Sequence, residues 1–244
     1  MRARQRHLNP KAAGAHTALD SRFEFSVATG TAISSWVSRT GSNNASQATG
    51  GNQPLYTTNA INGQPAILFD GSNDFMTISS TITSNAVSVI AVGHKTAVGG
   101  STASASRITS IWNTANNAQT VGDFSGTSGW VVFYYFPSQW RSYRNGAEIL
   151  ALTLGYVPTV FGAVLDGASV TGSLAGTSAT GTTSATAVNA NEIRLGSAPY
   201  TGSGSSGALN GYIGYLVYFL SVLTVPMRRR LERGAGYSFK IACS

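Results

Sequence analysis

The sequence has a single cysteine, Cys243, next to the C-terminal residue. One thiol cannot form an intrachain disulfide or a cluster of thiolate metal ligands, so the fold must be held together by its core. Charged residues make up only 10% of the 244 positions, against roughly 25% in an average globular protein. This scarcity argues against salt-bridged surface helices and favours a turn-rich, uncharged β protein.

Long apolar runs are also missing. The N-terminal residues lack the 7–15-residue apolar segment that a secretory signal needs, and the longest apolar run, "YLVYFLSVLTV" at 215–225, is shorter than the ~20 residues that span a bilayer. We therefore expect neither export nor membrane insertion. Release by cell lysis would reconcile an extracellular type of composition with the lack of an export signal.

The formal charge of +7 is concentrated at the two ends of the chain. Residues 20–227 hold seven bases and eight acids, whereas 228–244 hold five bases and one acid. We interpret 1–19 as a basic arm that docks on an acidic partner surface; the alternative is a solvated, disordered terminus. No zinc-ligand set or nucleic-acid-binding motif is present, so specific nucleic-acid recognition is not expected. The basic residues of the arm are Arg2, Arg4, Arg6 and Lys11.

Tight-turn signals are frequent in this glycine-rich chain. Asn-Gly and Asp-Gly pairs accept the positive φ angles of hairpin turns, and apolar runs of strand length lie between them. This pattern predicts an antiparallel β architecture in which strands that are apolar on both faces lie between layers. The stretches 96–106, 171–190 and 201–208 are interpreted as surface loops. The five pairs begin at Asn62, Asp70, Asn145, Asp166 and Asn210.

One helix is predicted at about 225–238. Thr224 is a suitable N-cap, and Pro226 is tolerated in a first turn. Apolar residues recur every four positions at Met227, Leu231 and Ala235. The arginines between them are expected on the solvated outer face.

The order of several motifs resembles a known family. "ISSWVSRTGSNNASQATGGNQPLY" is followed by "INGQPAILFDGSNDFMTI" and, near the end, by "LNGYIGYLVYFLSVLTVPMRRRLERGAGYSFK". This succession is similar to concanavalin A-like lectin/glucanase domains of the laminin-G-like type found in bacteriophage virion proteins. The resemblance implies an all-β, two-sheet antiparallel jelly-roll sandwich with a short C-terminal helix. A single such domain is expected over 20–244, after the arm at 1–19.

Glycan hydrolysis requires a closely placed pair of carboxylates. The glucanase members carry Glu-x-Asp-x-x-Glu on one strand, and this chain has no such motif around Glu24, Glu148, Glu192 or Glu232. The histidines His7, His16 and His94 have no metal-ligand spacing. The sequence therefore predicts a protein that is not an enzyme.

Aromatic side chains are the candidates for binding. Exposed Trp or Tyr side chains can stack on sugar rings or anchor a protein contact, although most strand aromatics fill the core. Trp140 and Tyr143 lie beside a turn and are the best candidates for exposure among them, with Arg141 and Arg144 adding charge or cation–π contacts.

Asp70, Asn73 and Asp74 lie close together after the run "PAILF". Short polar side chains at a turn bond nearby backbone amides, which is a sufficient reason for their presence. Calcium binding is the alternative, but 6–8 oxygen ligands would be required. No other cofactor is expected.

Together these features favour a non-enzymatic structural, decoration or fibre protein of a bacteriophage capsid or tail. Its partners would be multiple copies of other virion proteins and host cell-surface carbohydrate, and its location the virion. The alternative is a free carbohydrate-binding lectin or a glycan-active hydrolase of the same fold.

Overall fold

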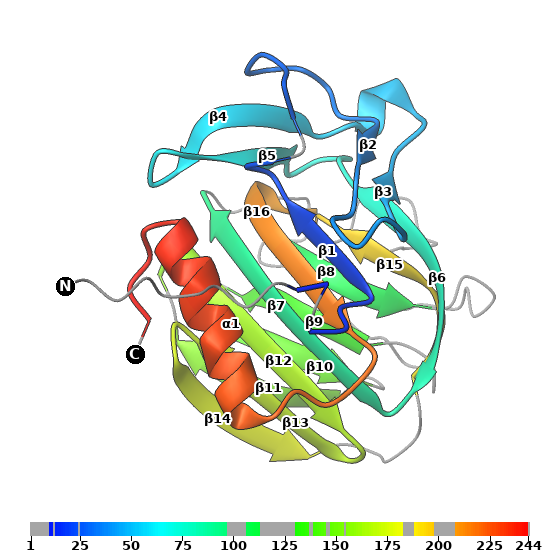
Figure 1. Cartoon of the computed structure of the whole chain (residues 1–244), viewed down its shortest axis with the longest axis vertical. Helices are drawn as coiled ribbons and strands as arrows, with labels where there is room; N and C mark the ends of the chain where they lie inside the picture. Colours follow the sequence, from blue (N-terminus) through cyan, green and yellow to red (C-terminus); the bar gives the residue numbers. More distant parts are fainter. Residues whose placement is uncertain are drawn as a thin grey trace.

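The computed structural model describes residues 10–11, 13–23, 25–96, 106–112, 130–136, 139–144, 147–153, 155–182, 188–197 and 208–243. Two antiparallel eight-stranded sheets pack face to face, and helix α1 (Val225–Ser238) lies on the outer face of the first (Figure 1). The predicted all-β sandwich with a C-terminal helix is confirmed at this level.

The first sheet, which carries the helix, is called sheet A. Its strand order is β14-β13-β12-β7-β16-β5-β4, and β1 pairs with β16 beside this path. The strands are β1 (Thr17–Asp20), β4 (Leu55–Ile61), β5 (Gln64–Asp70), β7 (Ala86–Lys95), β12 (Thr159–Asp166), β13 (Ser169–Leu174), β14 (Thr177–Thr182) and β16 (Asn210–Phe219).

The second sheet, sheet B, has the order β11-β10-β9-β8-β15-β6-β3-β2. Among the described elements there is one 3-10 helix, η1 (Gly50–Asn52), which follows the short strands β2 and β3 in the sequence. The strands are β2 (Ser35–Trp36), β3 (Ala45–Ser46), β6 (Met76–Ser84), β8 (Ser106–Trp112), β9 (Trp130–Phe136), β10 (Gln139–Arg144), β11 (Ala147–Thr153) and β15 (Val188–Leu195).

Strand β7 is apolar on both faces because it lies between two layers. Val89 and Ala91 belong to the core between the sheets, whereas Ile90 and Val92 belong to a second core under α1. Successive side chains of a strand point to opposite faces, so a strand covered on both sides is apolar throughout. The sequence prediction of strands buried between layers is correct for β7.

Two of the predicted tight turns have different outcomes. Asn62 and Gly63 have φ angles of 50° and 79° and join β4 to β5, as expected for a primed hairpin turn. Asn210 and Gly211 instead begin strand β16. A Cβ at Gly211 would lie 2.2 Å from the carbonyl oxygen of His94, so glycine there permits a close approach between strands rather than a turn.

The interpretation of 171–190 as a surface loop is wrong. Strands β13 and β14 form a hairpin in this segment, and its turn is Ala175–Gly176, with φ angles of 46° and 98°. Val170 and Leu174 are buried, while the Ser, Thr and Ala side chains of β14 are mostly exposed. A polar edge strand at the end of a sheet has the composition of a loop, which explains the error.

Helix α1 begins and ends where the sequence predicts. The Thr224 hydroxyl accepts a hydrogen bond from the Met227 amide at 3.5 Å. Leu231, Ala235 and Phe239 are buried in the second core, so the helix is held against β7 and β12 of sheet A. Side chains of α1 and of the end of β1 line one pocket.

The arginines of α1 do not all face solvent, which corrects the sequence prediction. Arg228 is 3% exposed, and its Nε lies 3.4 Å from Glu232 Oε1. Glu232 also hydrogen-bonds the Ser173 hydroxyl, and a Cβ on Gly162 would lie 2.1 Å from its Oε1. Burial raises the pKa of Glu232, opposed by Ser173 and by the nearby arginines. An ion pair is thus enclosed between helix and sheet.

Strand β1 crosses the boundary predicted between arm and domain. Residues 17–19, which the sequence assigns to the arm, pair with β16 and are buried. The hydroxyl of Ser21 then donates to the carbonyl oxygens of Pro65 and Gly214, at 2.6 and 2.8 Å. The sheet therefore begins before residue 20, because β16 offers β1 a ladder of backbone hydrogen bonds. The division into arm and single domain otherwise stays a prediction.

Candidate functional site

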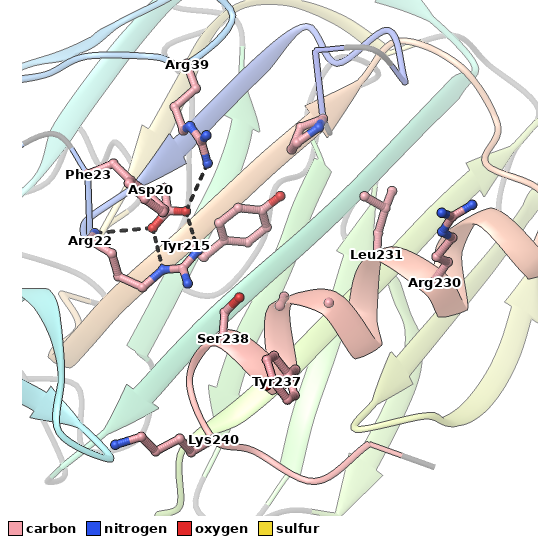
Figure 2. Close-up of a pocket in the computed structure, with 13 residues that line it drawn as sticks. Asp20, Arg22, Phe23, Arg39, Tyr215, Arg230, Leu231, Tyr237, Ser238 and Lys240 are labelled. Atoms are coloured by element: carbon pink, nitrogen blue, oxygen red, sulfur yellow. Dashed lines mark hydrogen bonds and ion pairs between the residues drawn. The ribbon is translucent and has the colours of Figure 1, made fainter. Parts of the chain in front are cut away.

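A pocket of about 620 Å³ lies between the end of β1, the segment after β2 and the exposed side of α1 (Figure 2). We call it the α1 pocket. Its walls combine cationic, aromatic and hydroxyl side chains from both ends of the chain. The lining residues are Pro10, Asp20, Arg22, Phe23, Arg39, Tyr215, Arg230, Leu231, Gly234, Ala235, Tyr237, Ser238 and Lys240.

A buried carboxylate lies at the base of this pocket. Asp20 is the last residue of β1, opposite Tyr215 of β16, and its side chain is 1% exposed. Arg22 Nε donates to Asp20 Oδ1 at 2.8 Å, and Arg22 Nη2 donates to Oδ2 at 2.6 Å. The turn after β1 directs Arg22 back onto Asp20, because the Phe23 amide bonds the Asp20 carbonyl and the Arg22 amide bonds Oδ1. A two-pronged pair of this kind compensates the buried charge.

Arg39 approaches the same carboxylate from another segment. Its amide donates to the Ala18 carbonyl at 2.8 Å, which holds the residues after β2 against β1. Its Nη1 lies 3.5 Å from Asp20 Oδ2, and its side chain is 41% exposed. The contact is longer and more exposed than that of Arg22, so Arg39 contributes less to compensating Asp20.

Phe23 presents an exposed ring at the rim. Its guanidinium neighbours are Arg39, 4.5 Å from the ring centroid, and Arg22, 4.9 Å away. The ring is nevertheless 61% exposed. Cation–π contacts restrict the ring while leaving part of it accessible.

The opposite wall is formed by the end of α1. Tyr237 is 69% exposed, and Ser238 lies beside it facing the pocket (Figure 2). Arg230 lies in the first half of the helix, away from Tyr237, and Lys240 follows the end of the helix (Figure 2). The described lining contains four cationic side chains and one carboxylate, so it has a surplus of three positive charges.

The predicted contact residues on β10 do not form this site. Trp140 is 3% exposed, and its ring centroid is 4.2 Å from that of Phe161. Trp140 is therefore a core residue and not an exposed contact residue as the sequence suggested, because its position on β10 points toward the inter-sheet core. Arg141 is half-buried and donates to Gln139 Oε1 at 2.7 Å. The side chains of Tyr143 and Arg144 lie outside the described structure.

The predicted docking residues are only partly described. Lys11 is exposed in a turn, whereas Arg2, Arg4 and Arg6 lie outside the described residues. The pocket residues were missed by sequence reasoning because Arg22 and Phe23 stand alone in a segment without a motif. The one usable signal is the basic segment of α1, which the sequence pattern assigns to a solvated face.

The Asp70, Asn73 and Asp74 side chains form a turn network, as the sequence suggests. Asp70 Oδ1 accepts backbone amide bonds from Ser72 at 2.8 Å and Asn73 at 3.2 Å, and Asp74 Oδ2 accepts the Asp70 amide at 3.0 Å. Asn73 Nδ2 donates to the Gly51 carbonyl at 2.7 Å. Within the described part of the chain no three His, Cys, Asp or Glu side chains are grouped as metal ligands. Calcium binding therefore stays an untested alternative.

Asp74 makes stability depend on pH. Burial, with a smaller effect of the Asp70 charge, raises its pKa from 3.8 to about 6. Between these values folded Asp74 holds a proton that the unfolded chain has released, so stability falls as pH rises across this window. Asp74→Asn removes the charge, and we expect it to raise the free energy of unfolding at pH 7 by about 1–3 kcal/mol.

Urea unfolding of both proteins from pH 4 to pH 7 measures this effect. The difference between Asp74→Asn and the parent should grow from pH 4 to pH 6 and then stay constant. A difference that does not vary with pH would contradict the assignment of a raised pKa to Asp74.

No described helix has the length and apolar character required to cross a membrane. No family model matches the sequence, and no curated protein matches it. Solved structures do match its fold.

A sialidase of Trypanosoma rangeli in complex with sialic acid superimposes with a TM-score of 0.64, 11% sequence identity, and coverage of 93% of this chain and 33% of that chain. A mutant of that sialidase displaying trans-sialidase activity has a TM-score of 0.60 and 10% sequence identity, and the match covers 95% of this chain and 34% of that chain. A mutant GH54 α-L-arabinofuranosidase soaked with 4-nitrophenyl α-L-arabinofuranoside has a TM-score of 0.59 and 13% sequence identity, and the match covers 83% of this chain and 50% of that chain. This chain thus spans about a third of the sialidases and half of the arabinofuranosidase.

These likenesses correct the functional prediction. The reported neighbours are glycosidases, which favours the alternative of a glycan-binding or glycan-active protein over a non-enzymatic virion protein. The same likenesses contradict the prediction that the protein is not an enzyme, and the missing Glu-x-Asp-x-x-Glu motif excludes only one arrangement of carboxylates. TM-scores of 0.59–0.64 at identities of 10–13% show a shared fold and nothing finer. A shared fold does not test the predicted virion partners or the predicted location in a virion.

Proposed function

We propose that this chain is a glycan-active protein that binds a sugar in the α1 pocket. The observation that carries the proposal is this pocket, lined by exposed aromatic and hydrogen-bonding side chains, on a fold shared with solved glycosidases. We also propose that the sandwich is of the concanavalin A-like, jelly-roll type, as the order of sequence motifs suggests.

The pocket walls suit the two kinds of surface on a sugar ring. The rings of Phe23 and Tyr237 can cover its C–H face, as aromatic side chains offer large apolar area at little conformational cost. The Ser238 hydroxyl and the Arg39 guanidinium can bond its hydroxyl groups. The buried Asp20–Arg22 pair holds the base of the site rigid, which limits the entropy lost on binding.

Removing either ring is expected to weaken binding. Phe23→Ala and Tyr237→Ala should each lower the affinity for the best glycan about five- to tenfold, since each removes a stacking surface. Glycan array screening followed by titration calorimetry measures the change. Tyr156→Ala is a matched control, because Tyr156 is 42% exposed and lies outside the pocket.

Affinity of the control variant should stay within about twofold of the parent, an effect below 0.5 kcal/mol. If the parent protein binds no neutral or charged glycan, the proposal fails. It also fails if both pocket variants bind as tightly as the parent.

Glycan hydrolysis is the second candidate, favoured by the raised pKa of Asp74 in a turn that lies outside the α1 pocket. A carboxyl whose pKa is raised to about 6 beside another carboxylate resembles the acid and base of a glycosidase. Release of reducing sugar from a bound glycan, abolished by Asp74→Asn while binding persists, would support it. Release that Asp74→Asn leaves unchanged would exclude this pair.

A further inference from the structure

We propose that the connection from β16 to α1, together with the first turns of α1, docks on an acidic phospholipid bilayer. Aliphatic side chains enter the headgroup region, and Arg229 and Arg233 face the lipid phosphates. This surface is separate from the α1 pocket, because neither arginine lines that pocket. We name it the α1 entry surface. Its members are Leu220, Val222, Val225, Met227, Arg229 and Arg233, all of them exposed.

Exposed aliphatic side chains are concentrated on this surface. The described residues include ten large hydrophobic side chains that are exposed, and four of them lie within the eight residues 220–227. Val225 is 53% exposed, and the other three are 37–38% exposed. Single exposed apolar residues are common on proteins, whereas a cluster of them marks contact with a partner or with a membrane.

The connection is fixed to sheet A, which holds these side chains on the outside. The Ser88 hydroxyl on β7 donates to the Ser221 carbonyl at 2.8 Å and accepts the Leu223 amide at 2.9 Å. Leu223 is buried in the core under α1. Val222 lies between these two anchored residues and is therefore directed outward. A surface held in this way needs little ordering when it binds, which limits the entropy cost.

The exposed charges on the same surface are positive. Residues four apart on a helix share one side, so Val225, Arg229 and Arg233 form a row. Glu232 is the only acidic residue in 220–243, and it is 2% exposed because it is enclosed between helix and sheet. A surface that combines cations with aliphatic side chains fits a layer of anionic headgroups above acyl chains.

A bilayer fits this surface better than a protein or a nucleic acid does. Four partly exposed aliphatic side chains supply a small part of the roughly 800 Å² that each partner buries in a stable protein complex. A bilayer has no fixed shape to match, and each apolar side chain that enters it contributes separately. A nucleic acid would contact the arginines and leave the aliphatic side chains in water, because its binding depends on phosphate contacts and aromatic stacking.

Co-sedimentation of the full chain with lipid vesicles tests the proposal. We expect binding to vesicles of phosphatidylcholine with about 30% phosphatidylserine, and roughly tenfold weaker binding to phosphatidylcholine alone. Val225→Ser should lower the partition coefficient about threefold, since it removes an inserted apolar side chain. Arg233→Gln should lower it about fivefold, since it removes a charge at the acidic surface. Increasing salt should weaken binding of the parent protein.

Two matched variants control for exposure and for charge. Val157→Ser changes a valine that is 50% exposed and lies outside the α1 entry surface. Val157 precedes β12, whose first residues pair with the end of β7, whereas β16 ends beside Ser88 near the start of β7. Arg141→Gln removes one positive charge from β10 of sheet B. Both variants should bind vesicles within about twofold of the parent.

Several results would overturn the proposal. Absence of binding to acidic vesicles would refute it, as would equal binding to both kinds of vesicle. Losses in Val157→Ser and Arg141→Gln as large as those in Val225→Ser and Arg233→Gln would also refute it. A single-stranded oligonucleotide that binds as tightly as acidic vesicles, and whose binding Val225→Ser leaves unchanged, would identify a polyanion site instead. Thermal unfolding of each variant shows whether lost binding is lost folding.

Discussion

Replacing Arg22 by alanine is expected to lower the free energy of unfolding by about 3–5 kcal/mol, because it leaves a buried carboxylate without its main partner. Asp20 is 1% exposed and receives both of its short contacts, 2.8 and 2.6 Å, from Arg22. Guanidinium unfolding at pH 7 measures the change. The effect should be the largest of any single charge removal around the α1 pocket.

Arg39→Ala is the control for this prediction. Its contact with the same carboxylate is 3.5 Å, and its side chain is 41% exposed, so we expect a loss of only about 0–1 kcal/mol. Asp20→Asn combined with Arg22→Ala should recover part of the stability lost in Arg22→Ala, since no buried charge then remains. Equal losses for Arg22→Ala and Arg39→Ala would contradict the different roles given to the two arginines.

The second large effect is expected at Trp140. Its indole packs on Phe161 of the facing sheet, with ring centroids 4.2 Å apart and ring planes inclined by 57°. Trp140→Ala removes this contact and leaves a cavity between the sheets, so we expect a loss of about 3–5 kcal/mol in unfolding free energy. Chemical denaturation measures the loss, and glycan binding in the α1 pocket should persist under conditions where the variant is folded.

Arg141→Ala provides the matched control for Trp140→Ala. Arg141 is the next residue of β10, is half-buried, and bonds the neighbouring Gln139 side chain. Its removal should cost no more than about 1 kcal/mol, as is usual for surface polar contacts. A Trp140→Ala loss as small as that of Arg141→Ala would show that the tryptophan does not bridge the sheets.

Parts of the fold followed from local patterns. The double-sided apolar strand β7 indicated a layer on each face, and the Asn62–Gly63 pair indicated a hairpin turn. Thr224 and Pro226 indicated where α1 begins. Each of these features depends on side chains within a few residues, so the sequence contains the information directly.

Other features depended on long-range contacts that no local pattern encodes. Trp140 lies next to a turn and resembles an exposed binding residue, yet the register of β10 directs it into the core. Arg228 resembles the neighbouring solvated arginines, yet helix packing buries it beside Glu232. Strand β14 has the composition of a loop and is ordered by pairing with β13.

The antiparallel all-β class, the final helix and the turn built from Asp70, Asn73 and Asp74 can all be inferred from local sequence, because turn chemistry and strand periodicity act over short distances. The α1 pocket, in contrast, depends on the packing of segments that are distant in the sequence. The α1 pocket forms because β1 pairs with β16, which immediately precedes the helix, and so brings Arg22 and Phe23 to Arg230 and Tyr237. Residues from the two ends of the chain become neighbours only when β1 and β16 pair.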